Sequence, residues 1–368
     1  MPQPVRSNEP AARASTRALP GLQVLRALAA LLVVLHHAEL NVLSGFGFGR
    51  EPLFNVASSG VDIFFVISGF IMLVSSRRLF AAPGGSATFM ARRLIRIVPL
   101  YWAITTVYVA GYALAPAALG RTVSLGTIVA SYFFWPFIGI DGQYHPVLVV
   151  GWTLNYEMFF YALFAIAIFL PRPWAVAFVT GALAFTIVLA SFLGGSSPPL
   201  AFWGQPIVLE FAAGIALALA YERRRFVPRP VAALAACAAL AALACQIGQP
   251  IPGGWPRLVA YGLPALVLVG GVALASPSGR DSRLPRAAIF LGDASYSLYL
   301  VHLMTLTIVR VAAIRLGLVP RTATEAALFV IASIAASVAI AIASYALFER
   351  PVTRLLRRGL EAKKPAAA

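Results

Sequence analysis

Long apolar segments separated by short polar stretches constrain this chain more than any other feature of its sequence. Each of them comes close to the ~20 mainly apolar residues that a transmembrane helix needs. Only 11% of the 368 residues are charged, against roughly 25% in soluble domains, so the bilayer must be the solvent for most of the chain. Helices satisfy their backbone polar groups internally, as lipid requires. The sequence therefore predicts an all-α, polytopic membrane helical bundle of about ten transmembrane helices, near residues 22–40, 56–76, 94–115, 147–170, 174–193, 203–221, 231–247, 256–275, 288–312 and 324–348.

Residues 124–140 are also hydrophobic, but this stretch is short and contains Pro136 near its end. Counting it as a span would move every later loop to the other side of the membrane. We therefore expect a short re-entrant or interfacial segment on the outer side. Aromatic residues there suit an anchor at the level of the lipid headgroups.

The positions of lysine and arginine predict the orientation. With the N-terminus inside, 22 of the 29 Lys and Arg residues fall in cytoplasmic segments and five in outer segments, while Arg26 and Arg310 lie within spans. This asymmetry follows the positive-inside rule, so we expect both termini in the cytoplasm. The net charge of +16 then reflects this bias and attraction to anionic lipid at the inner leaflet. We find no basic face interleaved with aromatic residues, and expect no nucleic-acid partner.

The predicted organisation is one membrane domain between two tails. We expect a disordered cytoplasmic tail over residues 1–20, a transmembrane domain over 21–350 and a basic cytoplasmic tail over 351–368. The two cysteines lie in one apolar span, and two thiols make no metal site, so no metal is expected.

Arg26 and His37 are charged or titratable residues in the first predicted span. Such residues are costly in lipid and usually face a cavity or a partner. They are eleven positions apart, which puts them on one helical stripe about 16 Å from each other. Either a ligand runs between them, or Arg26 snorkels to the inner interface and His37 merely sits at the outer one. Spacing alone leaves both interpretations open.

Glu157, Asp62 and His302 are the other candidates for catalysis. Glu157 lies about three turns inside the membrane, where a carboxylate needs a cation or a proton, and Arg26 and the histidines are the cations that the spans offer. The plainer alternative for Asp62 is a helix-start acid stabilised by the helix dipole. For His302 it is a buried neutral histidine bonded to a neighbour. Ser68 and Gly69 would, in the same way, simply permit close helix packing.

Arg93 and Arg96 form a basic site at the inner end of the third span. They are three positions apart and share a helical face. Guanidinium groups suit phosphate, so the partner is either a phosphate-bearing cytoplasmic ligand or the lipid headgroups.

Taken together, these segments resemble the acyltransferase 3 family of integral membrane acyltransferases, from about residue 20 to 355. The Arg-x10-His motif of that family matches Arg26 and His37, and its Arg-x-x-Arg motif matches Arg93 and Arg96. The sequence around Glu157 looks most like the exopolysaccharide O-acetyltransferases, although Met158 stands where many members have a second acid. Further blocks similar to the family follow in order, at residues 60–70, 92–102, 151–161, 291–302 and 348–351.

The resemblance implies an enzyme of the bacterial inner membrane. Its acyl donor would be cytoplasmic acetyl-CoA, and its acceptor a hydroxyl of an exopolysaccharide or other cell-surface glycan, or of its lipid-linked precursor. Some members carry a periplasmic hydrolase-like domain after the last span; this chain ends too soon for one, so we expect the bundle alone to complete the transfer. Whether it associates with polysaccharide assembly machinery stays open. We assign catalysis to His37, Arg26, Glu157, His302 and Asp62, and donor binding to Arg93, Arg96 and Ser68.

A transporter or flippase of a sugar-containing or anionic substrate is the alternative, because intramembrane charges also mark substrate pathways. Transporters often contain internal repeats, and we find none here. Consumption of the thioester distinguishes the two functions.

Overall fold

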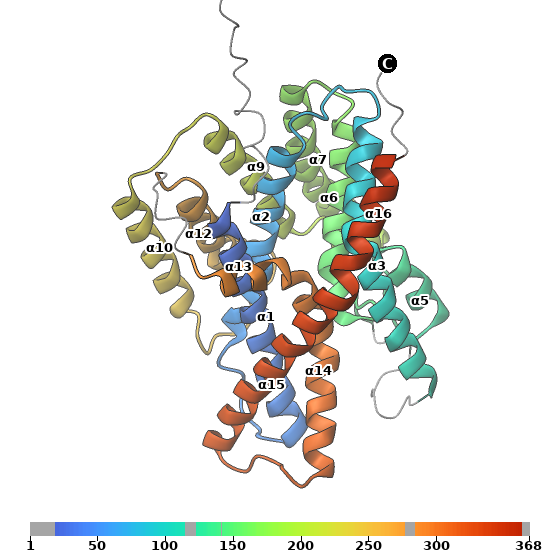
Figure 1. Ribbon diagram of the computed structural model, residues 1–368, viewed down its shortest axis with the longest axis vertical. Coiled ribbons are helices and arrows are strands. Elements are labelled where there is room, and N and C mark those ends of the chain that lie inside the picture. The colour runs from blue at the N-terminus through green and yellow to red at the C-terminus, as the bar shows by residue number, and fades with distance from the viewer. Residues whose placement is uncertain (1–18, 115–122, 141, 277–283, 363–368) are drawn as a thin grey trace, which may run out of the picture.

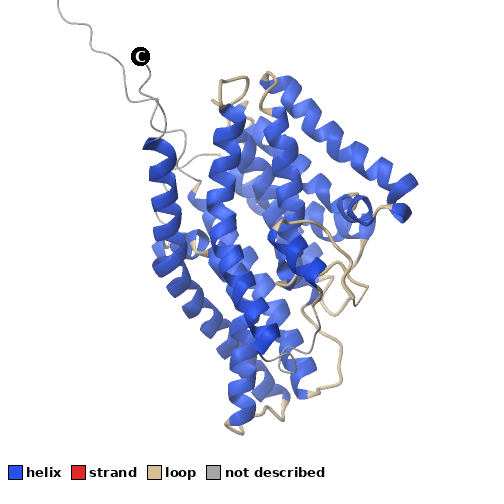
Figure 2. Cartoon of the chain, turned by 90° about the vertical axis from the view of Figure 1, so that its right-hand side faces the viewer, coloured by secondary structure: helices blue, strands red, loops and turns tan. Residues whose placement is uncertain are grey.

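The computed structural model describes residues 19–114, 123–140, 142–276 and 284–362. Helices make up nearly all of the regular structure in these residues (Figure 2). No strand occurs in these ranges apart from one isolated bridge between Val227 and Ala275. Most of the predicted N-terminal tail and the end of the C-terminal tail lie outside the described residues.

The helices that belong to the membrane-spanning stretches account for most of the predicted spans (Figure 1). They are α1 (Pro20–Phe46), α2 (Gly60–Ser75), α3 (Gly85–Leu114), α6 (Trp152–Ala167), α7 (Arg172–Leu193), α12 (Leu263–Ala273), which continues α11 (Gly254–Arg257) through a π-helical turn, α14 (Ser295–Arg315) and α15 (Ala323–Ser344). The other helices are α5 (Leu125–Tyr132), α8 (Pro198–Trp203), α9 (Leu209–Glu222), α10 (Arg229–Ala244), α13 (Arg286–Asp293) and α16 (Arg350–Ala362).

Within the described residues, eight helical stretches are long and apolar enough to cross a membrane. The prediction of a polytopic helical bundle is therefore confirmed. Two predicted spans, 203–221 and 231–247, contain shorter helices: α9 has 14 residues and α10 has 16. The predicted span 288–312 is divided between α13 and α14 at Ala294. Residues 124–140 form only the eight-residue helix α5 and an irregular stretch, which is too short to span.

Helices α2 and α9 cross at very short distance because glycine lies at the contact on both helices. A Cβ atom on Gly69 would lie 2.0 Å from the carbonyl oxygen of Phe211, and one on Gly214 would lie 2.1 Å from that of Val66. Any side chain would push the two backbones apart. This geometry confirms the packing role expected of Gly69 and makes α2 a fixed central element of the bundle.

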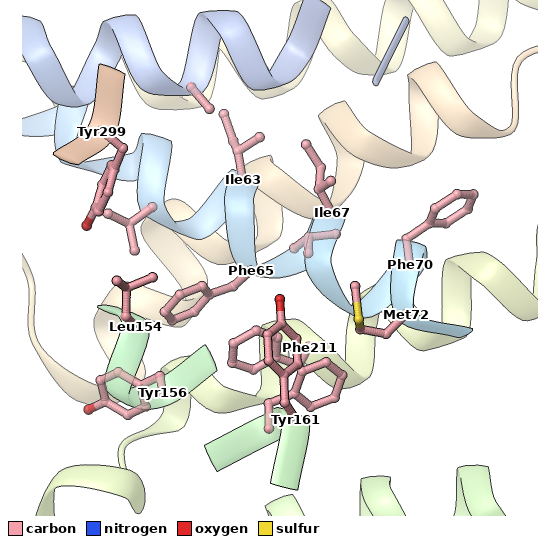
Figure 3. Close-up of a cluster of buried hydrophobic side chains, with 14 of the residues drawn as sticks. Ile63, Phe65, Ile67, Phe70, Met72, Leu154, Tyr156, Tyr161, Phe211 and Tyr299 are labelled. Carbon is pink, nitrogen blue, oxygen red and sulfur yellow. The ribbon is translucent and has the colours of Figure 1, made fainter. Parts of the chain in front are cut away.

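A buried stack of aromatic rings joins α6 to the α2–α9 pair. The ring of Phe211 stacks on Phe65 at 4.5 Å and on Phe160 at 4.4 Å between centroids, and Figure 3 shows Phe65 and Phe211 among the buried side chains. Stacked rings bury large apolar areas in defined geometry. The stack therefore fixes the position of α6 relative to α2.

The last helices return along the bundle to α3. A π-helical turn, Tyr345–Glu349, links α15 to α16, and α16 packs against α3 (Figure 1). The C-terminal helix thereby reaches the part of α3 that carries the predicted basic site.

Candidate active site in the helical bundle

A cavity of about 220 Å³ lies between α1, α2, α3, α6 and α14. Helices that are distant in sequence thus place their polar residues around one space. Its lining includes five of the eight predicted site residues: Arg26, Ser68, Arg93, Arg96 and Glu157.

Arg26 and Arg93 bring positive charge to this cavity, and neither has an acidic partner among the described residues. The Nη1 atom of Arg26 donates to Oε1 of Gln23 at 3.2 Å, and the guanidinium of Arg93 lies over the ring of Phe89 at 5.8 Å. Nε of Arg93 is buried without a hydrogen-bond partner in the described part of the chain. Neither arginine forms an ion pair there. Both guanidinium groups are therefore available to an anionic ligand.

Arg96 differs from Arg93, although the sequence treats them as a pair. It forms an ion pair with Glu349, which is only 2% exposed, and lies 5.4 Å from the ring of Tyr296. The other carboxylate oxygen of Glu349 accepts a 2.5 Å hydrogen bond from Ser297. The charge of Arg96 is thus largely compensated by Glu349, a partner that was not predicted from the sequence.

Glu157 is held by hydroxyl groups and not by a cation. Its Oε1 accepts hydrogen bonds from Tyr161 and, at 3.2 Å, from Ser68. No ion pair to Glu157 occurs in the described residues, but its charge acts on both Arg26 and Arg93. Ser68 therefore positions this carboxylate, a role that the sequence did not predict for it.

His37 and His302 lie side by side, from α1 and α14. Nδ1 of His37 is 3.3 Å from Nε2 of His302 and 2.8 Å from the carbonyl oxygen of Val33. Nδ1 of His302 is 3.1 Å from the carbonyl oxygen of Leu298. Since carbonyl oxygens only accept, each Nδ1 carries the hydrogen in the neutral pair.

This tautomer defines the chemistry of the histidine pair. Nε2 of the fully buried His302 can accept from the Nδ1–H of His37, and Nε2 of the half-buried His37 keeps its lone pair. A neutral imidazole with a free Nε2 and an oriented ring has the form of a general base.

Tyr299 lies between the cavity and the histidine pair. It lines the cavity, and its ring centroid is 6.1 Å from that of His302. Its hydroxyl donates to the carbonyl oxygen of Val150 at 3.0 Å and lies 2.8 Å from Oγ1 of Thr153. The cavity therefore ends one ring short of the histidines, which do not line it.

Asp62 lies apart from the cavity, in a buried ion pair. Its two carboxylate oxygens accept from Nη2 and Nε of Arg257, at 2.7 and 3.2 Å. The nearby Glu210 is 1% exposed, and neither of its oxygens has a partner in the described residues. Asp62 does stand in the first turn of α2, as the helix-start interpretation requires. Arg257 was not predicted as a partner of Asp62, because the sequence places it in an outer segment.

Across the described ranges, no three His, Cys, Asp or Glu side chains gather in a way that could hold a metal ion. The polar groups of the cavity are guanidinium, carboxylate, hydroxyl and amide groups. They are suited to binding a charged organic molecule.

Comparison with known proteins identifies relatives over most of the chain. A family model described as an acyltransferase domain matches residues 19–346. The exopolysaccharide production protein ExoZ of Rhizobium meliloti (strain 1021) is 37% identical over 316 residues, which cover 83% of this chain and 92% of that protein. The acyltransferase MdmB of Streptomyces mycarofaciens is 30% identical over 78% of this chain and 79% of its own.

A more distant relative is the peptidoglycan O-acetyltransferase OatA of Listeria monocytogenes serovar 1/2a. It is 25% identical over 80% of this chain, but the match covers only 50% of its own length. No solved structure matches the chain.

Proposed function

Because the chain belongs to the acyltransferase 3 family of integral membrane acyltransferases, we propose that it transfers an acetyl group from acetyl-CoA to a glycan hydroxyl. The acceptor is an exopolysaccharide, another cell-surface glycan or its lipid-linked precursor. The name of the relative ExoZ, an exopolysaccharide production protein, and that of OatA, a peptidoglycan O-acetyltransferase, support this choice of acceptor.

The observation that carries the proposal is a cavity with cationic groups at one end and a neutral histidine pair beyond the other. Arg26 and Arg93 offer guanidinium groups that form no ion pair within the described part of the chain, and such groups bind phosphate with charge-assisted hydrogen bonds. The stripe from Arg26 to His37 is about 16 Å long by helix rise. This distance is suited to the thin pantetheine arm that links the phosphates of coenzyme A to its thioester.

In the proposed reaction, the acceptor oxygen attacks the thioester carbonyl carbon while Nε2 of His37 removes the hydroxyl proton. A C–O bond forms, the C–S bond breaks, and coenzyme A leaves as a thiolate that takes up a proton. His302 acts through His37, since it touches only the Nδ1 side of that ring. If the acetyl group first passes to His37, the same lone pair is the nucleophile, so both routes need a free Nε2.

The location follows from the charge pattern of the sequence. We propose that the protein lies in the bacterial inner membrane with both termini in the cytoplasm, so that Arg93 faces the donor pool and His37 lies toward the outer leaflet. Anionic lipid at the inner leaflet would contact the basic segments. Residues 21–350 would form the transmembrane acyltransferase domain, flanked by the two tails.

Acetyl-CoA turnover by purified protein in liposomes, with a panel of sugar acceptors, tests the function. A transporter would move solute without consuming the thioester. We expect His37→Gln to lose 10²- to 10⁴-fold in turnover, the usual contribution of a general base, at normal abundance in the membrane.

Two neighbouring histidines refine this test. His302→Gln should retain part of the turnover, because an amide can still accept from Nδ1 of His37. His36→Gln is the matched control on the adjacent position of α1 and should lose far less than His37→Gln. Near-full turnover in His37→Gln would show that this histidine is structural.

A further inference from the structure

Helix α16 presents one packed side and one arginine-rich side. Leu356 lines an apolar groove on α3 with Leu94, Ile95 and Val98. Val352, Thr353 and Leu360 are half-buried on the same side of the helix. The rest of the helix surface carries four arginines: Arg350, Arg354, Arg357 and Arg358.

Among these arginines, Arg357 is turned most toward the bundle. At about 100° per residue, it lies roughly 85° from the centre of the packed side, whereas Arg358 lies roughly 175° away. The charge of Arg357 acts on both Arg93 and Arg96. Because α16 packs against α3 and the preceding Leu356 lies in one groove with Leu94 and Ile95, the exposed Arg357 extends the basic site of α3. It comes from a segment that the sequence describes only as a basic tail.

Two contacts fix the start of α16 at this site. Glu349, directly before α16, forms an ion pair with Arg96 of α3 and accepts from Ser297 of α14. Arg357 follows eight residues later, about 12 Å along the helix. The helix thus leaves the cavity at the level of Arg96 and carries Arg357 outward beside Arg93.

Positive charge exceeds negative charge around this site. Guanidinium groups repel one another strongly where water is scarce, and a ligand with several negative charges would relieve that repulsion. The five cations are Arg26, Arg92, Arg93, Arg96 and Arg357, against the carboxylates of Glu157, Asp293 and Glu349.

We propose that Arg357 binds the 3′-phosphate on the ribose of the coenzyme A donor, so that α16 forms the outer wall of the donor site. This inference rests on the proposed function. Along the donor, the thioester is followed by the pantetheine arm, the diphosphate and the ribose 3′-phosphate. Along the protein, His37 is followed by the cavity, by Arg26 and Arg93 and, farthest out, by Arg357. The order of groups along the donor matches the order of residues along the protein when the thioester points toward the histidines.

The phosphate of an anionic lipid headgroup has the same chemistry, and the experiment separates the two sources. Binding of coenzyme A and of 3′-dephospho-coenzyme A is measured by calorimetry on the full chain in nanodiscs. One set of nanodiscs contains phosphatidylcholine alone, and the other also contains phosphatidylglycerol. Because this readout needs no turnover, it does not depend on the acceptor.

In nanodiscs of phosphatidylcholine alone, Arg357→Gln should weaken coenzyme A binding about tenfold or more, the scale of one charge-assisted contact. Its affinity for 3′-dephospho-coenzyme A should not change. Arg358→Gln, adjacent but on the far side of α16, should leave both affinities unchanged. All three proteins should elute as single species of equal size.

Three results would overturn the inference. If Arg357→Gln weakened the binding of coenzyme A and of 3′-dephospho-coenzyme A equally, the 3′-phosphate would not be the ligand of Arg357. An effect confined to phosphatidylglycerol nanodiscs would assign Arg357 to lipid. In either case the proposed function stands, whereas a wild-type protein that binds neither nucleotide would overturn both.

Discussion

The buried ion pair between Asp62 and Arg257 predicts an asymmetric response to mutation. Asp62 is fully buried, and both of its carboxylate oxygens accept hydrogen bonds from Arg257. The buried carboxyl group of Glu210 also lies near Arg257. The arginine therefore faces two buried carboxyl groups, but within the described residues only Asp62 receives its hydrogen bonds.

The costs of the two single substitutions follow from this arrangement. Arg257→Gln leaves the buried carboxylate of Asp62 without a cation, and breaking a buried pair in this way costs about 3–5 kcal/mol. Asp62→Asn removes the charged acceptor but leaves Glu210 beside Arg257 as a compensating acid, so we expect roughly 1.5–3 kcal/mol, the scale of hydrogen bonds to a charged group. The double variant should be more stable than Arg257→Gln alone, since the unpaired carboxylate of Asp62 is gone.

The apparent Tm of the four proteins in one detergent, measured by fluorescence-detected size exclusion, provides the double-mutant cycle. The expected order is wild type, Asp62→Asn, the double variant and Arg257→Gln, from most to least stable. The reasoning is refuted if Asp62→Asn is the least stable single variant, or if the two effects simply add. Turnover per folded molecule should stay within about tenfold of wild type in Asp62→Asn. A loss of 10²-fold or more at unchanged Tm would instead support the catalytic role assigned to Asp62 from the sequence, because that is the usual scale for a catalytic acid or base.

Two further substitutions test the packing and the basic site. Gly69→Ala should lower the yield of folded protein and cost about 1–3 kcal/mol of stability, as overpacking does. The control Gly181→Ala, which has nothing within 4 Å of the added Cβ, should be neutral or slightly stabilising. Equal yields of the two variants would contradict the close crossing of α2 and α9. Arg96→Gln should lower the apparent Tm because it leaves the buried Glu349 without a cation. Arg93→Gln should raise the KM for acetyl-CoA at unchanged Tm. If instead Arg96→Gln raised the KM and Arg93→Gln lowered the Tm, Arg96 would be the donor ligand.

The bundle itself was predictable because hydropathy follows directly from residue type, but the ends and breaks of helices were not. Residues 288–312 have the composition of one span, yet the chain turns at Ala294 between α13 and α14. Gly292 shows why. A Cβ atom there would lie 2.1 Å from the carbonyl oxygen of Gln23, so α13 is fitted closely against α1. Such a contact between distant segments leaves no trace in a hydropathy profile.

The candidate site was predictable where it depends on spacing within one helix. The interval from Arg26 to His37 and the interval from Arg93 to Arg96 each define a face from sequence alone. Partners from other helices were not predictable, since Glu349 is 253 positions from Arg96 in the chain. Arg257 was missed for a related reason: a single arginine at the edge of a span is most simply explained as an interfacial residue.

The walls of the cavity supply the remaining step from geometry to mechanism, on the proposed function. Between Arg26 and Tyr299 the lining is largely apolar, with Val61, Phe64 and Ile67 on one side. Phosphate cannot enter such a stretch without losing its hydration, which is very costly for a charged group, whereas a thioester is neutral. The donor can therefore bind in only one direction, with its phosphates among the arginines and its acyl group toward Tyr299. The ring of Tyr299 lines the cavity, and its centroid is 6.1 Å from that of His302, so we expect this ring to turn aside before the acetyl group meets the base. Tyr299→Ala would open that passage, and we expect it to speed loss of acetyl groups to water, measured as acetyl-CoA hydrolysis without acceptor. If hydrolysis in Tyr299→Ala equals that of the wild type at equal abundance, the ring is not the barrier.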